Sequence, residues 1–244
     1  MANPVFNLIE SQREDEFVID SDKVMTVNGT IQITAVLGII LLLAASFVWS
    51  RYSLGYMDMV QMLTFGGLFI GFILALIISF TKTIFLVPIY AACEGCVLGG
   101  FSAMMEAGYP GIVSQAVAGT FAALFSMLLL YRCNIIKCTD KFRSVIFIST
   151  LSIAGIYLVD LIGGFFGLSI PMINTSSPFG ILFSIVIVAI AALNLIIDFD
   201  FIERGSERML PKIYEWYGAF GLLVTIVWLY IEILNLLVKL RGRD

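Results

Sequence analysis

The sequence predicts an all-α, polytopic membrane protein built as a single bundle of seven transmembrane helices. Of its 244 residues, 60% are hydrophobic and only 13% are charged, whereas a soluble domain has about 25% charged residues. The apolar residues form runs that repeatedly reach the ~20 residues needed to cross a bilayer as a helix. A transmembrane β-barrel is a poor alternative, because the runs lack the period-two alternation of barrel strands.

The first 30 residues differ from the rest of the chain because they are polar and acidic. They have neither the positive start nor the small-residue cleavage site of a signal peptide, so we expect the first apolar run to be retained as a membrane anchor. Residues 1–30 are therefore predicted to form a short acidic cytosolic arm. Residues 31–244 are predicted to form the seven-helix transmembrane domain.

Seven apolar runs define the spans in chain order. Their predicted ranges are 31–49, 59–79, 84–105, 111–131, 145–163, 179–197 and 216–240. Small residues on four of these spans mark places where helices can approach closely. They are Gly67, Gly71, Gly95, Gly99, Gly119, Ala123, Gly218 and Gly221.

The distribution of Lys and Arg predicts the orientation, because cytoplasmic loops carry an excess of these residues. Ten of the 14 lie on the side of the N-terminus and the even-numbered turns. The chain is therefore predicted to be an integral, multi-pass protein of a bacterial inner membrane, with a cytoplasmic N-terminus and an external C-terminus. The basic tail, Lys239, Arg241 and Arg243, runs against this assignment, and a re-entrant final segment would remove the conflict.

The chain contains no histidine, which excludes the Ser-His-Asp triad, the commonest metal ligand and the ordinary physiological-pH switch. It has no basic patch of the size that binds nucleic acid. Two carboxylates on successive helices occur in intramembrane aspartyl proteases, but the Tyr-Asp and Gly-x-Gly-Asp motifs of that class are absent. We therefore expect no enzyme activity, no cofactor and no nucleic-acid partner.

Cys93 and Cys96 form a Cys-x-x-Cys pair inside the third apolar run, and Cys133 and Cys138 lie in a basic loop. A Cys-x-x-Cys pair can bind a metal or exchange disulfides. Because there is no second such pair and no histidine, small packing residues are the better interpretation.

Carboxylates inside the apolar runs are the main candidates for function, because an Asp at the centre of a membrane helix costs ~2.5 to 3.5 kcal/mol on insertion scales. Glu94 lies in the middle of the third span, Glu232 well inside the seventh, and Asp198 and Asp200 at the cytoplasmic end of the sixth. The alternatives are a structural, hydrogen-bonded Glu94 and interfacial roles for Asp198, Asp200 and Glu203.

Helical spacing predicts the surroundings of these acids. Asn194 lies four residues before Asp198 on one face of the sixth span, which gives this acid a polar companion, whereas Asp200 is expected to point toward headgroups or water. One stripe of the seventh span is expected to face the bundle interior. The stripe comprises Gly218, Gly221, Thr225, Trp228, Glu232 and Asn235, while Leu223, Ile226, Tyr230 and Leu237 lie on other faces.

A central glutamate such as Glu232 is tolerated only if it is protonated, paired or beside water. A second carboxylate nearby would couple the two titrations. Such a pair can act as a proton-sensitive latch, because two ionised acids repel each other and two acids that share a proton hold together. The deprotonated oxygens would also suit a hard divalent cation such as calcium, and Glu94 is a third candidate for lining such a cavity.

Two stretches in the last third of the chain are the most specific: IAALNLIIDFDFIERG and EWYGAFGLLVTIVWLYIEILNLL. With them, and with YAACEGCVLGGFS and NPVF earlier in the chain, the sequence resembles a bacterial branch of the Bax inhibitor-1/YccA family of seven-helix membrane proteins. The resemblance implies a pH-sensitive calcium leak whose latch, one carboxylate on each of the last two helices, opens on deprotonation. Asp198 matches the sixth-helix acid, and Glu232 stands where better-known relatives have an aspartate on the seventh.

Two departures from the family pattern concern this latch. Leak-type relatives carry an acid in the second span and an arginine just after it, whereas nothing between Asp58 and Lys82 ionises here. The connection from Asp198 to Glu232 is also longer, so a straight hairpin would place these acids ~12 Å and ~33 Å from its turn near residues 206–210. Either residues 199–214 fold back, or Glu232 partners Glu94 or another polar group.

The sequence therefore predicts a pH-sensitive cation leak, with calcium as the transported or weakly bound ion and the lipid bilayer as its surroundings. The alternative is a non-transporting membrane regulator that binds a membrane protease or another quality-control partner through the acidic arm. The oligomeric state and the ion selectivity are left open by the sequence.

Overall fold

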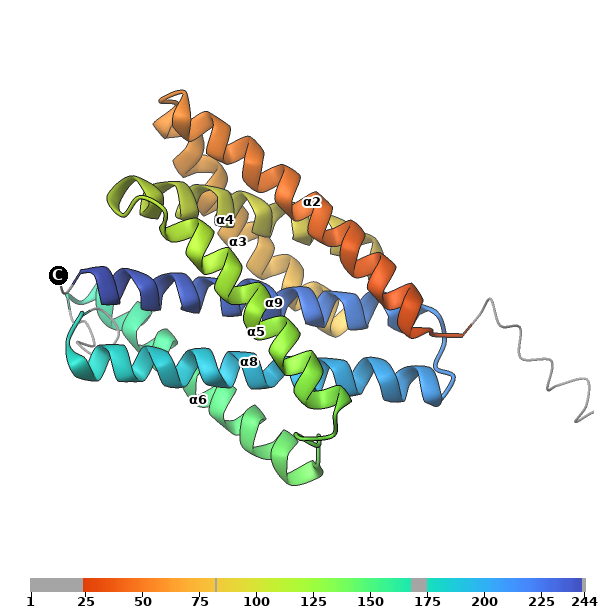
Figure 1. Cartoon of the computed structure of the whole chain (residues 1–244). Helices are drawn as coiled ribbons and strands as arrows, with labels where there is room; N and C mark the ends of the chain where they lie inside the picture. Colours follow the sequence, from red (N-terminus) through yellow and green to blue (C-terminus); the bar gives the residue numbers. More distant parts are fainter. Residues whose placement is uncertain (1–23, 82, 168–174, 243–244) are drawn as a thin grey trace, which may run out of the picture.

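The structure, a computed structural model, describes residues 24–81, 83–167 and 175–242, and every regular element in these ranges is helical (Figure 1). Seven of the helices are long and apolar enough to cross a membrane, which confirms the predicted seven-helix bundle. The seven helices are α2 Val27–Ser53, α3 Met57–Thr81, α4 Val87–Gly108, α5 Ile112–Arg132, α6 Asp140–Phe165, α8 Pro178–Glu207 and α9 Ile213–Arg241, and the short 3₁₀ helix η2, Ile84–Leu86, leads into α4.

Local sequence fixes where several helices begin. The hydroxyls of Thr26, Thr139 and Ser177 accept hydrogen bonds from backbone N–H groups in the first turns of α2, α6 and α8, and such caps satisfy donors that the helix leaves unpaired. Helix α5 follows Gly111, whose φ of 81° lies in the left-handed region that glycine adopts without strain.

Helix α9 lies at the centre of the bundle, with α8, α2 and α5 packed around it (Figure 1). Thr225 and Glu232 are buried on it, as the predicted interior stripe requires. Leu223 and Tyr230 are buried as well, so the prediction that they lie away from the interior is wrong. Because α9 has protein neighbours on several sides, more than one stripe of it is covered.

Helices α2 and α4 approach each other backbone to backbone at the predicted glycines. A Cβ at Gly99 would lie 2.8 Å from the Cα of Ala45, and a Cβ at Gly95 would lie 2.7 Å from the Cβ of Ala44. No such Cβ fits, so only glycine permits this contact. The small residues of the third span therefore set how closely these two helices pack.

Cys93 and Cys96 lie where α4 crosses α3. A Cβ at Gly67 of α3 would lie 2.8 Å from the carbonyl oxygen of Cys93 and 3.3 Å from the Cβ of Cys96. Both thiols are free. They occupy the packing position that the sequence predicted for them.

The segment before α2 is fixed to the turn between α8 and α9. The N–H of Met25 donates to the carbonyl of Leu210 at 2.7 Å, and Oε1 of the buried Glu215 accepts from the N–H and the hydroxyl of Thr26 at 2.9 and 2.8 Å. Helix α2 begins at Val27 behind the Thr26 cap, four residues before the predicted start of the first span at residue 31. Residues 1–23 of the predicted acidic arm, with its predicted partner role, lie outside the described residues.

Helices α8 and α9 form a straight hairpin. Helix α8 continues to Glu207, a short turn follows, and α9 runs unbroken from Ile213 to Arg241, so the predicted re-entrant final segment is not formed. The basic end of α9 instead bonds to neighbouring helix ends. Nζ of Lys239 donates to the carbonyl of Gly180 and the hydroxyl of Ser184, and Arg241 donates to the carbonyl of Pro110 at 2.7 Å.

We expect Gly99→Ala to lower the stability of the protein by about 1 to 3 kcal/mol, because the added methyl overpacks the α2–α4 contact. Gly38→Ala on α2 is the matched control, since a Cβ there meets nothing within 4 Å. Thermal unfolding of both variants in detergent measures the difference. Equal midpoints for the two variants would contradict the role of Gly99.

Candidate functional site

Asp198 lies in the interface between α8 and α9. Its Oδ1 is 3.6 Å from the position that a Cβ of Gly221 would take, and the side chain of Thr225 lies beside it. The hydroxyl of Thr225 donates to the carbonyl of Gly221 at 3.1 Å. Oδ2 of Asp198 is buried and has no hydrogen-bond partner. Asp198 is therefore a carboxyl group inside the bundle with one oxygen unsatisfied, and ionising it would leave charge on that oxygen without a donor.

Glu232 is buried on α9 and is held by neutral donors. The hydroxyl of Tyr157 on α6 lies 2.8 Å from Oε1 and 3.0 Å from Oε2, and the indole N–H of Trp228 donates to Oε1 at 3.1 Å. Trp228 is one turn earlier on the same helix, as the predicted stripe requires. Tyr157 comes from the fifth span, in which the sequence predicted no candidate residue.

Asp198 and Glu232 do not meet. Asp198 lies level with Thr225, and Glu232 is two helical turns beyond Thr225, ~10 Å farther along the axis of α9. Glu232 has its own donors, Tyr157 and Trp228. Of the two alternatives that the sequence left open, the structure has the second, in which Glu232 partners a polar group and the latch between these two acids is not formed.

Glu94 lies in a third neighbourhood, between α4 and α3. Its Oε1 is 3.4 Å from the position that a Cβ of Gly71 would take, and Tyr90 lies one turn earlier on α4. The structure thus separates the three predicted site acids and joins no two of them. Asn235, predicted as an accessory residue, is half-buried on α9 three residues beyond Glu232.

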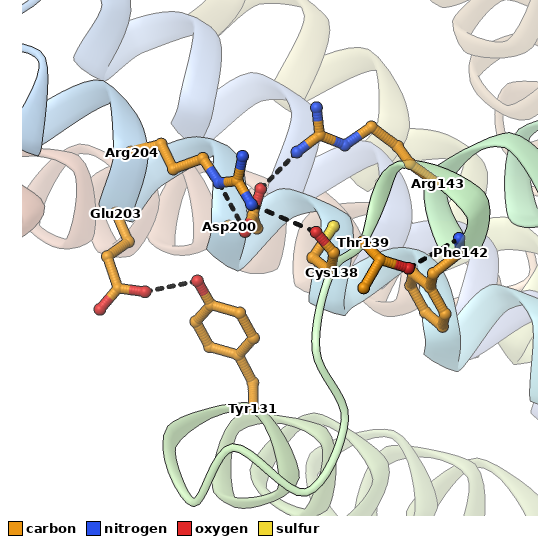
Figure 2. Close-up of polar contacts among 8 residues, drawn as sticks. All are labelled: Tyr131, Cys138, Thr139, Phe142, Arg143, Asp200, Glu203 and Arg204. Carbon is orange, nitrogen blue, oxygen red and sulfur yellow. Dashed lines mark hydrogen bonds and ion pairs between the residues drawn. The ribbon is translucent and has the colours of Figure 1, made fainter.

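Asp200 is buried, so the prediction that it points toward headgroups or water is wrong. Its carboxylate binds the guanidinium of Arg143 on α6 at 2.5 Å and that of Arg204, one turn later on α8, at 2.9 Å (Figure 2). Arg204 also donates to the carbonyl of Cys138 at 3.2 Å. The reason for the burial is tertiary, because α6 and the loop before it cover this face of α8.

Asn194 is also bound to α6 and not to Asp198. Its amide donates to the hydroxyl of Thr150 and to the carbonyl of Ile190, both at 2.9 Å. The prediction that Asn194 is the polar companion of Asp198 is therefore wrong. Asp198 lies beside Thr225 of the neighbouring helix instead.

A polar cavity of about 720 Å³ lies beside Asp200 and is lined by α5, the loop before α6, and α8. Glu203 accepts a hydrogen bond from the hydroxyl of Tyr131 at this cavity (Figure 2), and Arg132 lies 3.8 Å from its other oxygen. Within the described residues, no group of three or more acids or cysteines is placed to hold a metal ion. A transported or weakly bound calcium ion stays a prediction.

Sequence reasoning missed the contribution of α6. Tyr157 and Arg143 bind two of the candidate acids, and Asp160, three residues beyond Tyr157, is a further acid inside the predicted fifth span. Asp160 could have been found by inspecting every apolar run for ionisable residues. The partners of Tyr157 and Arg143 depend on helix neighbours and carry no signal in local sequence.

Comparison with known proteins gives one family. The family model described as Bax inhibitor 1 like matches residues 3–242. No curated protein matches the chain significantly. The family match covers all seven helices, including both helices of the straight hairpin.

We expect Asp200→Asn to destabilise the protein by about 1 to 3 kcal/mol, because it leaves two guanidinium groups facing each other. The loss of stability is smaller than for a fully buried ion pair, because both arginine side chains are about two-fifths exposed to solvent. Thermal unfolding in detergent measures it. Glu207→Gln, at an exposed position of the same helix end, is the control.

A double-mutant cycle that combines Asp200→Asn with Arg143→Gln tests the ion pair between these two residues. If Arg143 and Asp200 interact, the two single effects will not add in the double variant. Additive effects would show that the two residues stabilise the protein separately.

We expect Cys138 to be alkylated more slowly than Cys133 in the folded protein. Cys133 is exposed, whereas burial raises the pKa of the Cys138 thiol and so lowers the fraction of reactive thiolate at mildly alkaline pH. Time-resolved alkylation with peptide mapping measures both rates. In the unfolded protein both thiols should react at similar rates. Equal rates in the folded protein would contradict the burial of Cys138.

Proposed function

Because the chain belongs to the Bax inhibitor 1-like family, we propose that it is a pH-sensitive cation leak, with calcium as the first candidate ion, and that Asp198 is its proton-responsive group. The observation that carries the proposal is the buried Oδ2 of Asp198, which has no hydrogen-bond partner between two membrane-spanning helices. A polar group in that position is costly in lipid and indicates a function.

The chemistry of Asp198 gives the direction of the response. When Asp198 is protonated, its carboxyl group is neutral and the packing of α8 against α9 needs no further donor. When it loses the proton, the charge requires solvation, which is available only if water enters or the helices move apart. The leak should therefore increase as the pH rises through the titration of Asp198.

The proposal differs from a latch of two carboxylates. Thr225 faces Asp198 on α9, where a second acid would have to lie for the two groups to share a proton. A single carboxyl group loses its one proton in a single titration step as the pH rises. A coupled pair of carboxyl groups loses its two protons in two separate steps. We therefore expect one step in the dependence of the flux on pH.

The proposed setting is a bacterial inner membrane, with the N-terminus in the cytoplasm and the C-terminus outside. The excess of Lys and Arg on the side of the N-terminus supports this orientation. An odd number of candidate spans, seven, supports ends on opposite sides of the membrane.

We expect Asp198→Asn to remove the pH dependence of calcium flux into proteoliposomes, because the amide cannot ionise. Asp58→Asn, at an exposed position in the first turn of α3, is the charge-matched control and should behave as the unmodified protein. An Asp198→Asn variant that inserts normally and keeps the full pH response would contradict the role of Asp198 as the proton-responsive group.

Glu232→Gln separates the single-carboxyl mechanism from the latch. Since Glu232 has no contact with Asp198, we expect the variant to change the size of the flux while its pH midpoint stays in place. A shift of the midpoint as large as that produced at Asp198 would favour coupled acids instead. The same proteoliposome flux measurement, taken across a series of pH values, decides between them.

A further inference from the structure

Helix α6 is the most loosely packed of the helices. It lies on the outside of the bundle and packs against α8 (Figure 1). Among the α6 side chains that the structure describes, two are buried, Ile146 and Ile153. In lipid, apolar side chains gain little by leaving the hydrocarbon for a helix contact, so these two residues hold α6 weakly.

Polar contacts attach α6 to the α8–α9 hairpin, and the α6 residues that make them are regularly spaced along the helix. Arg143, Thr150 and Tyr157 are seven residues apart, so they share one face of α6 with the two isoleucines. Arg143 binds Asp200 at 2.5 Å, the hydroxyl of Thr150 accepts from Asn194 at 2.9 Å, and the hydroxyl of Tyr157 donates to Glu232 at 2.8 Å.

These three contacts form a polar seam between α6 and the α8–α9 hairpin. From Arg143 to Tyr157 the seam extends ~21 Å along the helix, at 1.5 Å per residue. The hydrocarbon layer is ~30 Å thick, so the seam places polar groups at three depths through most of it. The α2–α4 contact is of a different kind, because the backbones of these helices touch at Gly95 and Gly99.

We propose that this polar seam is the route by which water and cations cross the membrane, and that α6 is the helix that moves to open it. Separating α6 from the hairpin breaks few apolar contacts, and water can replace each polar contact that is lost. It also uncovers Glu232 on the hairpin side, where a negative charge would favour cations, while Asp200 keeps Arg204 of α8 as its partner. The cation route rests on the proposed function, whereas the entry of water does not.

Cysteine accessibility tests the seam. In a background with the four native cysteines replaced by alanine, Thr150→Cys lies on the seam. Ser152→Cys is the matched control, because it has nearly the same depth on α6 but faces away from the bundle at an exposed position. A membrane-impermeant, positively charged methanethiosulfonate reagent is added to proteoliposomes that hold the full chain.

We expect Thr150→Cys to react at least about tenfold faster than Ser152→Cys, because a thiol in apolar surroundings stays protonated and unreactive. Asn194→Cys, from the facing helix, should react as Thr150→Cys does, and it replaces that variant if Thr150→Cys fails to insert. Reaction at the seam should also block calcium flux. Equal rates at the seam and at residue 152 would overturn the proposal.

The outcomes separate this inference from the proposed function. A pH-dependent leak that persists while the seam thiols stay unreactive overturns the route and leaves the leak in place. Fast reaction at the seam without any calcium flux supports the water route and overturns the leak. Fast reaction that leaves an existing flux unchanged overturns the seam as the path of the cation.

Discussion

The register of the α8–α9 hairpin determines which polar groups meet inside this bundle. The hairpin turns directly after Glu207 and both helices continue without a break, so each residue of α8 faces a fixed level of α9. Asp198 is therefore opposite Gly221 and Thr225. Glu232 lies two helical turns beyond Thr225 on α9, where it accepts a hydrogen bond from Tyr157 of α6. Three hydrogen bonds fix the N-terminal segment to this turn, one from Met25 to Leu210 and two from Thr26 to Glu215.

Lipid provides no hydrogen bonds, so every polar group in the hydrocarbon layer must find its partner within the protein. The acids of this chain meet the requirement in different ways. Asp200 is paired with two arginines, Glu232 accepts hydrogen bonds from a phenol and an indole, and Oδ2 of Asp198 has no hydrogen-bond partner. This difference is what singles out Asp198, because the cost of ionising a carboxyl group is greatest where the fewest donors surround it.

The bundle also contains two kinds of helix contact with different mechanical properties. Helices α2 and α4 touch through glycines and cannot separate without losing many close contacts. Helix α6 is attached mainly by polar bonds, and water can replace such bonds one by one. A movement of the bundle is therefore easier at α6 than on the opposite side of α9.

The sequence by itself determined the seven spans, the glycines of close approach and the acids Glu94, Asp198 and Glu232 inside the spans. It could do so because hydropathy and helical period are local properties. It could also place residues on a face of a helix, as with Thr225 and Glu232 on the interior stripe. It could not say which helix covers that face. Asp200 was expected at water and is buried, and Asn194 was paired with Asp198 and binds Thr150, since in both cases α6 arrives from elsewhere in the chain. Only the tertiary structure decided these partners, because a hydrogen bond between helices depends on their neighbours and their register, and neither is written in the spacing of one segment.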